Sequence, residues 1–154
     1  MRLMLTGLFM LILALPAIAE NASPHSGTII IETGQPFDVY LKRLDAAIKA
    51  NKMGIVGKAC ATCGANAIGV SIPGNRIIMI FNPHFAVRML DASIAAGVEA
   101  PLRFYVTENS DGSARLSYRQ PSHVFAPYEV PALNDMAREL DVIIEQIVAE
   151  TAVD

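Results

Sequence analysis

The stretch IIMIFNPHFAVRML, residues 77–90, decides the fold, because it joins a buried strand directly to a helix. Residues 77–81 are a continuous apolar run, which is typical of a strand covered on both faces. Asn82 is a favourable N-cap and Pro83 a favourable first helical residue. Gly97 fits the position just after the helix. Apolar side chains recur between these ends at helical spacing, at Phe85, Met89, Leu90 and Ile94.

A β-hairpin is predicted downstream of this helix. In residues 102–107 and 114–119 apolar and polar side chains alternate, as expected for two strands with one face in water. The turn sequence NSDG, residues 109–112, separates them. Residues 121–129 are expected to be a loop that could hold a short strand. Pro131 then opens the last helix, whose expected buried stripe is Leu133, Met136, Leu140, Ile143, Ile144 and Ile147.

The upstream part adds a strand, a helix and a second strand. The β-branched residues 28–31 predict the first strand, and Pro36 opens a helix with Phe37, Leu41, Leu44 and Ile48 on its apolar face. Residues 53–59 predict the second strand, whereas residues 60–70 are small and give no clear element. The order β-α-β-(loop)-β-α-β-β-α predicts an α+β domain with a single mixed sheet and helices packed on it.

The amino-terminal residues 1–19 have the pattern of a secretory signal peptide. Arg2 precedes an apolar run, and Ala17-Ile18-Ala19 is a small-x-small cleavage site. The run is short for a membrane helix, which needs roughly 20 apolar residues. We therefore expect a periplasmic or secreted protein that starts at Glu20 and has no membrane span after cleavage. A flexible segment, residues 20–26, is expected to precede a single domain over residues 27–150.

Charge and motifs exclude several classes of function. The net charge is −3 and the chain has no run of Lys or Arg, so nucleic acid is not an expected partner. The chain lacks the G-x-S-x-G pattern of common hydrolases, the Walker pattern of nucleotide-phosphate sites and the G-x-G-x-x-G pattern of dinucleotide sites. These missing motifs leave enzymatic activity undecided, but they favour a non-catalytic protein with no cofactor.

Several features of residues 71–128 form one pattern, namely Phe81-Asn82-Pro83, then Ala86, Arg88, Met89 and Leu90, then Gly97 and Ala100-Pro101-Leu102, and the hairpin around Tyr105. Through this pattern the chain resembles the bacterial family called domain of unknown function 302. The resemblance covers roughly residues 26–127. The resemblance implies a small α+β fold that tends to form dimers, so we expect a homodimer. It implies no catalytic residues, and it implies that Cys60 and Cys63 replace small residues common in relatives.

Cys60-Ala61-Thr62-Cys63 is the most specific motif in the sequence that could carry chemistry. On one strand the two Cα atoms would be about 10 Å apart, beyond the roughly 4.4–6.8 Å that a disulfide allows, so a bridge requires the strand to end near Cys60. A passive pair, a redox pair and a soft-metal site holding copper or zinc remain open. Gly64 and Asn66 disfavour the following helix that a redox pair prefers. Gly64 also excludes c-type haem attachment, which needs His there.

The remaining candidate residues surround the strand-to-helix junction. A helix start offers free N–H groups to an anion, so Asn82, His84, Arg88 and His123 are the candidate ligand-binding residues. We therefore expect an exported, non-catalytic homodimer that binds a small ligand or a partner there. The alternative is a periplasmic thiol-redox or metal protein that acts through Cys60 and Cys63.

Overall fold

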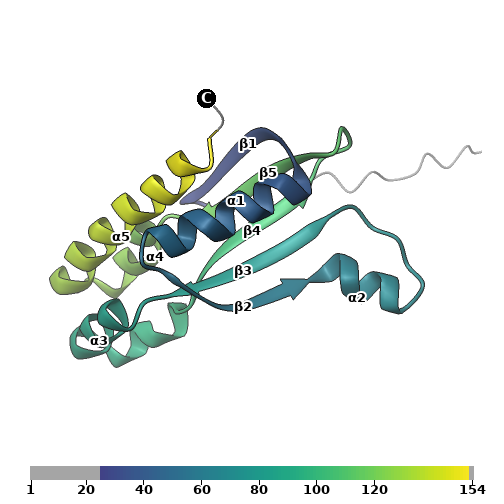
Figure 1. The fold of residues 1–154 in the computed structure, drawn as a ribbon. Coiled ribbons are helices and arrows are strands. Elements are labelled where there is room, and N and C mark those ends of the chain that lie inside the picture. Colours follow the sequence, from purple (N-terminus) through teal and green to yellow (C-terminus); the bar gives the residue numbers. More distant parts are fainter. Residues whose placement is uncertain (1–24, 153–154) are drawn as a thin grey trace, which may run out of the picture.

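The computed structural model describes residues 25–152, so the predicted signal peptide and most of the segment 20–26 lie outside the described residues. Twelve elements follow one another along the chain (Figure 1). They are β1 (Thr28–Pro36), α1 (Phe37–Ala50), β2 (Gly54–Cys60), α2 (Ala61–Ala67), β3 (Asn75–Phe81), α3 (Pro83–Ala92), η1 (Ile94–Glu99), β4 (Leu102–Glu108), β5 (Ser113–Arg119), α4 (Pro121–Phe125), η2 (Ala126–Tyr128) and α5 (Pro131–Glu150).

The five strands form one sheet in the order β1-β5-β4-β3-β2, with helices packed on it, which confirms the α+β class. Every neighbouring pair is antiparallel, so the sheet is not mixed. The reason lies in the β1-α1-β2 unit. Its strands run in the same direction, but they occupy opposite edges of the sheet. Three strands lie between them, so no parallel pair forms.

The hydrophobic core lies between one face of the sheet and helices α1 and α5. Alternate residues of the hairpin, such as Phe104, Val106 and Leu116, are fully buried on that face, which confirms the predicted period of two. Leu44 and Ile48 of α1 are also fully buried. The predicted stripe of α5 is confirmed at Leu133, Met136, Leu140, Ile144 and Ile147, whereas Ile143 is only partly buried. Within residues 25–152, no helix combines the length and apolar character that crossing a membrane requires.

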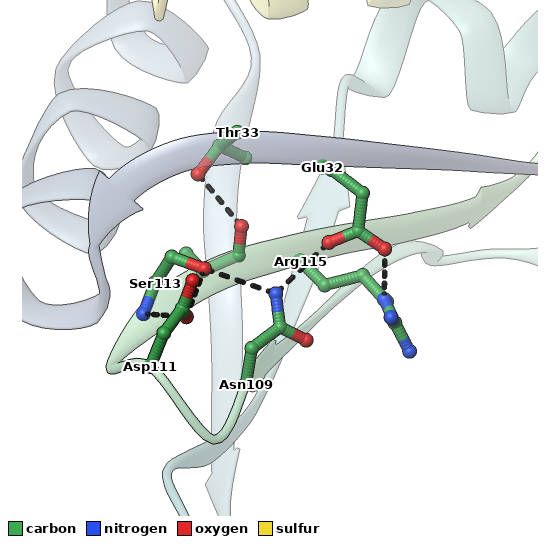
Figure 2. Close-up of polar contacts among 7 residues, drawn as sticks. Glu32, Thr33, Asn109, Asp111, Ser113 and Arg115 are labelled. Carbon is green, nitrogen blue, oxygen red and sulfur yellow. Dashed lines mark hydrogen bonds and ion pairs between the residues drawn. The ribbon is translucent and has the colours of Figure 1, made fainter.

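A polar network ties edge strand β1 to the turn between β4 and β5 (Figure 2). Glu32 accepts hydrogen bonds from Asn109 Nδ2 at 2.9 Å and from Arg115 Nε at 2.5 Å. These contacts hold the pKa of Glu32 below its usual value, with the hydrogen bond from Asn109 as the largest cause. Asp111 accepts from the Ser113 amide at 2.9 Å and closes the turn.

Two predictions about the α3 region and the segment after the hairpin are wrong. Helix α3 ends at Ala92, where Ser93 is extended, so Gly97 lies inside η1 and does not follow the helix end. Residues 121–129, expected to be a loop or a short strand, form α4 and η2. Asp141 of α5 accepts a hydrogen bond from the Ser122 amide at 2.9 Å. This contact stabilises the first turn of α4 and joins residues far apart in the chain.

The segment after β2 also differs from the prediction. Gly64 and Asn66 argued against a helix there, yet residues 61–67 form the short helix α2. Thr62 anchors its first turn by donating to the Pro73 carbonyl at 3.0 Å. None of its side chains is buried, and it lies beyond the end of the helix-covered part of the sheet (Figure 1).

Candidate functional site

The β3–α3 junction is capped by Asn82, as predicted. Its Oδ1 accepts from the His84 amide at 2.9 Å, and its Nδ2 donates to the Lys52 carbonyl at 3.0 Å. The Ala86 amide donates to the Asn82 carbonyl at 3.1 Å, and Pro83 has no amide hydrogen. The chain itself therefore uses most of the donors of this helix start, which leaves little for an anion.

A small apolar hollow of about 30 Å³ lies beside this junction, between β3, α3 and α5. Asn82 is the one polar side chain among its lining residues, so the hollow favours an apolar occupant. Three of the lining side chains are methionines, which are flexible and repack easily. The full lining is Met53, Ile80, Phe81, Asn82, Phe85, Ala86, Met89, Ala100, Leu102, Phe125, Met136 and Leu140.

His84 and Arg88 are exposed and do not line this hollow. The two terminal nitrogens of the Arg88 guanidinium, Nη1 and Nη2, each donate to Glu139 of α5 at 2.7 Å. The Arg88 Cζ lies 5.4 Å from the centre of the Phe85 ring. The Arg88 hydrogen bonds lower the pKa of the Glu139 carboxyl. Arg88 therefore connects α3 to α5, and its charge is already paired.

His123 lies in α4, next to the beginning of β1. Gly27 has a φ of +76°, and a Cβ added to it would lie 2.1 Å from the His123 ring. The imidazole thus packs on the Gly27 backbone, where only glycine fits. Of the four candidate ligand residues, only Asn82 lines the apolar hollow. Within residues 25–152, no three or more His, Cys, Asp and Glu side chains come close enough to hold a metal ion.

Cys60 and Cys63 form a disulfide with Cα atoms 5.2 Å apart. As the geometry required, β2 ends at Cys60, which becomes the N-cap of α2. The Cys60 sulfur accepts from the Cys63 amide at 3.0 Å. Cys63 is exposed, and Arg76 Nη1 lies 3.6 Å from its sulfur. The disulfide therefore joins a half-buried residue to an exposed one, with a cation beside one sulfur.

Sequence reasoning missed the lining of the apolar hollow. Met53, Met89 and Met136 come from three distant segments, and each is the kind of residue that a core also uses. Nothing in their spacing distinguishes them from core methionines. Only the packing of the sheet against α3 and α5 brings them together.

Comparison with a solved structure supports the fold. The crystal structure of an uncharacterized conserved protein DUF302 from Bacillus stearothermophilus superimposes with a TM-score of 0.74. The match covers 82% of this chain and 98% of that chain at 16% sequence identity, so it shows a shared fold alone. No curated protein matches this chain.

The family comparison covers nearly the whole domain. The family described as Domain of unknown function DUF302 matches residues 29–151, from β1 through the end of α5. This range includes the β3–α3 junction, both cysteines and the hairpin. The resemblance seen in the sequence is thereby confirmed, and the chain belongs to the DUF302 family.

Proposed function

We propose that this protein is an exported, non-catalytic binding module that takes a small apolar ligand in the hollow beside the β3–α3 junction. The observation that carries the proposal is the lining of that hollow, in which Asn82 is the single polar side chain. An apolar group that leaves water for such a surface gains roughly 25 cal/mol per Å² of area buried. The hollow therefore supplies affinity without any charged group.

Ligand entry requires the methionine side chains to repack. The volume of about 30 Å³ accommodates no more than a water-sized group in this conformation. Met89 and Met136 contribute flexible thioether chains to the wall, and such chains change rotamer at low cost. Ala86 also lines the wall and leaves space where a larger side chain would not. Once the methionines have repacked, the apolar lining would favour a compact aromatic ring over a polar ligand.

Indole is a suitable probe for this hollow. We expect its addition to shift the methyl resonances of Met89 and Met136 in a saturable manner, as observed by nuclear magnetic resonance. Ala86→Phe fills the hollow and should weaken indole binding at least tenfold. Ala46→Phe is the matched control, because it makes the same substitution at an exposed position of α1. Equal binding by both variants, or no shift in the parent protein, would contradict the proposal.

The export part of the proposal is supported by the leader sequence, residues 1–19, with its apolar run and small-x-small site. We expect protein recovered from a bacterial periplasm or culture medium to begin at Glu20. Intact-mass measurement tests this directly. A mature protein that retains Met1 would contradict export with cleavage.

We propose a homodimer that joins two copies through the exposed apolar side chains of α3 and η1. Ile94 and Val98 are 83% and 79% exposed, and Val87 and Leu90 extend the same surface along α3. Exposed apolar side chains that gather on one surface can pair with those of a second copy of the same chain. Ile94→Glu should give a monomer in light scattering, whereas Val142→Glu on α5 should not. A monomeric parent protein would end this proposal.

Thiol–disulfide exchange is a second candidate function, favoured by the exposure of the Cys63 sulfur beside Arg76. A partner thiolate would attack that sulfur, break the Cys60–Cys63 bond and release the Cys60 thiolate. A second partner thiol would then attack the mixed disulfide and release Cys63 as a thiol. The two partner thiols are thereby oxidised to one disulfide, and Cys60 and Cys63 are reduced to two thiols. Arg76 would stabilise the thiolate of Cys63 in the reduced form.

Equilibration with reduced and oxidised glutathione tests this second function. We expect a reversible two-electron transition in the parent protein, and a shift of its midpoint in Arg76→Gln, because Arg76 stabilises the reduced form. Arg138→Gln, far along the sequence on α5, should leave the midpoint unchanged. Metal analysis of the reduced protein after addition of copper or zinc tests the alternative in which Cys60 and Cys63 bind a soft metal. A bond that glutathione never reduces would remove the exchange function.

A further inference from the structure

Two arginines, Arg103 and Arg119, lie just beyond the last pair of residues at one end of the β4–β5 pairing. Phe104 pairs with Tyr118 and both are buried on the covered face, so the next residues outward, Arg103 and Arg119, project from the opposite face. Both are exposed. Like charges directly opposite on neighbouring strands repel each other and destabilise a sheet. A sequence that places two arginines there tolerates a cost that an anion between them would remove.

These are also the two arginines without a partner in the described part of the chain. Within residues 25–152, the structure gives neither guanidinium an ion pair or a hydrogen bond. Every other arginine in that part donates to a side chain. The five are Arg43 with Gln35, Arg76 with Cys63, Arg88 with Glu139, Arg115 with Glu32, and Arg138 with Asp135.

The two side chains border a hollow region. Arg103 and Arg119 line a hollow of about 40 Å³, and Arg119 also lines an adjoining one of about 250 Å³. The two hollows share Glu99, Arg119 and Val124. The larger one continues along apolar surface at Pro127 and along the ring of Tyr128. A cationic end and an apolar wall thus lie side by side.

We infer that Arg103 and Arg119 bind the carboxylate of a small organic acid whose apolar body rests against Val124, Pro127 and Tyr128. The planar fork of an arginine matches the two oxygens of a carboxylate. Glu99 is the one acid among the lining residues, and it accepts a hydrogen bond from the Tyr128 hydroxyl at 3.1 Å. Two arginines and one glutamate leave a net charge of +1, which favours a monoanion over a phosphate dianion.

This site adjoins the apolar hollow proposed above, with Leu102 as the one lining residue in common. Leu102 and Arg103 are neighbours on β4, but an extended strand directs successive side chains to opposite faces. Leu102 lines both hollows, but the apolar hollow extends from it to Phe125 and Leu140, whereas the carboxylate site extends to Arg103 and Arg119. Loss of one site does not require loss of the other.

Titration with benzoate, followed by calorimetry, tests the inference. Benzoate carries one carboxylate on an apolar ring, and benzamide has the same shape without the charge. We expect saturable benzoate binding at one site per chain, at least tenfold weaker binding of benzamide, and at least tenfold weaker binding of inorganic phosphate. Arg103→Gln and Arg119→Gln should each weaken benzoate binding at least tenfold.

Arg115→Gln is the matched control. Arg115 lies on the same face of β5, but its charge is paired with Glu32. Its loss should change benzoate affinity less than twofold, and circular dichroism should show all three variants folded. Equal weakening by Arg115→Gln would mean that net charge alone attracts the ligand and would overturn the site. Phosphate binding as strong as that of benzoate, or no benzoate binding, would overturn it as well.

Discussion

The two faces of the sheet differ although they are built from the same strands. On the covered face Phe104 and Tyr118 pack edge to face, with ring centres 5.6 Å apart. On the uncovered face Tyr105 is 38% exposed and accepts a hydrogen bond from Asn75 Nδ2 at 2.5 Å. One face therefore contributes the core and the apolar hollow, and the other presents polar and cationic groups to water.

An apolar site and a cationic site can therefore lie next to each other on one sheet. Leu102 of β4 lines both the apolar hollow and the cationic one, and the next residue, Arg103, lines the cationic hollow alone. The strand period of two makes this possible, because it allows each face its own selection of side chains. The apolar face is used for stability, so the other face is free for recognition.

The largest expected effect is the difference in stability between a substitution on the covered face and one on the uncovered face. Phe104→Ala removes a fully buried ring and should lower the free energy of unfolding by about 3–5 kcal/mol. Tyr105→Ala, one residue along, should cost less than about 1.5 kcal/mol, because it removes one exposed hydrogen bond. Urea denaturation measures both. Similar losses in the two variants would show that the uncovered face is packed against something.

A second prediction concerns the apolar hollow on the covered face. Leu140→Ala removes a buried side chain from its wall and should lower the free energy of unfolding by about 2–5 kcal/mol. The same change enlarges the hollow, so indole should bind more tightly and should raise the melting temperature more than in the parent protein. Destabilisation without tighter indole binding would show that the wall collapses into the space.

A third prediction concerns the arginines of the uncovered face. Without a bound anion, Arg103→Gln should raise the free energy of unfolding by about 0.2–1 kcal/mol, because it removes repulsion from Arg119. Arg115→Gln should lower it by at most about 1 kcal/mol, because it removes an exposed pair with Glu32. Thermal unfolding at low salt measures these opposite signs, and added salt should reduce both. The same sign in both variants would contradict the assignment of the partners.

The smallest expected effect is the pH dependence at Glu32. Its folded pKa lies below the usual value of 4.5, so its carboxylate stabilises the fold above that pH. This stability is lost as the pH falls through the lowered pKa. Glu32→Gln should therefore be less stable than the parent at pH 7, and the difference should vanish in acid. A titration of Glu32 by nuclear magnetic resonance checks the direction, and Glu150→Gln serves as the control.

Much of the fold could be predicted because it depends on local patterns. The helix that starts after Asn82 has a favourable cap, and the hairpin has alternating strands with a turn sequence between them. The end of the second strand near Cys60 could also be predicted, on the condition that the two cysteines form a disulfide, because a bridge cannot form within a strand. Sheet order was not predictable, because the pairing of β1 with β5 depends on contacts between distant residues.

The candidate sites divide in the same way. Asn82 and the cysteine pair could be found from their motifs, because capping and disulfide geometry act over a few residues. The methionine lining of the apolar hollow and the pairing of Arg88 with Glu139 could not, because both depend on where α5 packs. Sequence reasoning therefore placed Arg88 in a ligand site, whereas the structure uses it to connect two helices.

By itself the amino-acid sequence determined the kinds of elements along most of this chain, their main boundaries and the side chains that face the core. These follow from hydrophobic period, capping and turn chemistry, which act between neighbours. Only the tertiary structure decided that α2 and α4 are helices, that β1 and β2 are opposite edges, and that Arg103 and Arg119 stand together without a partner. Those features depend on docking between segments far apart in the chain, and no local pattern contains that information.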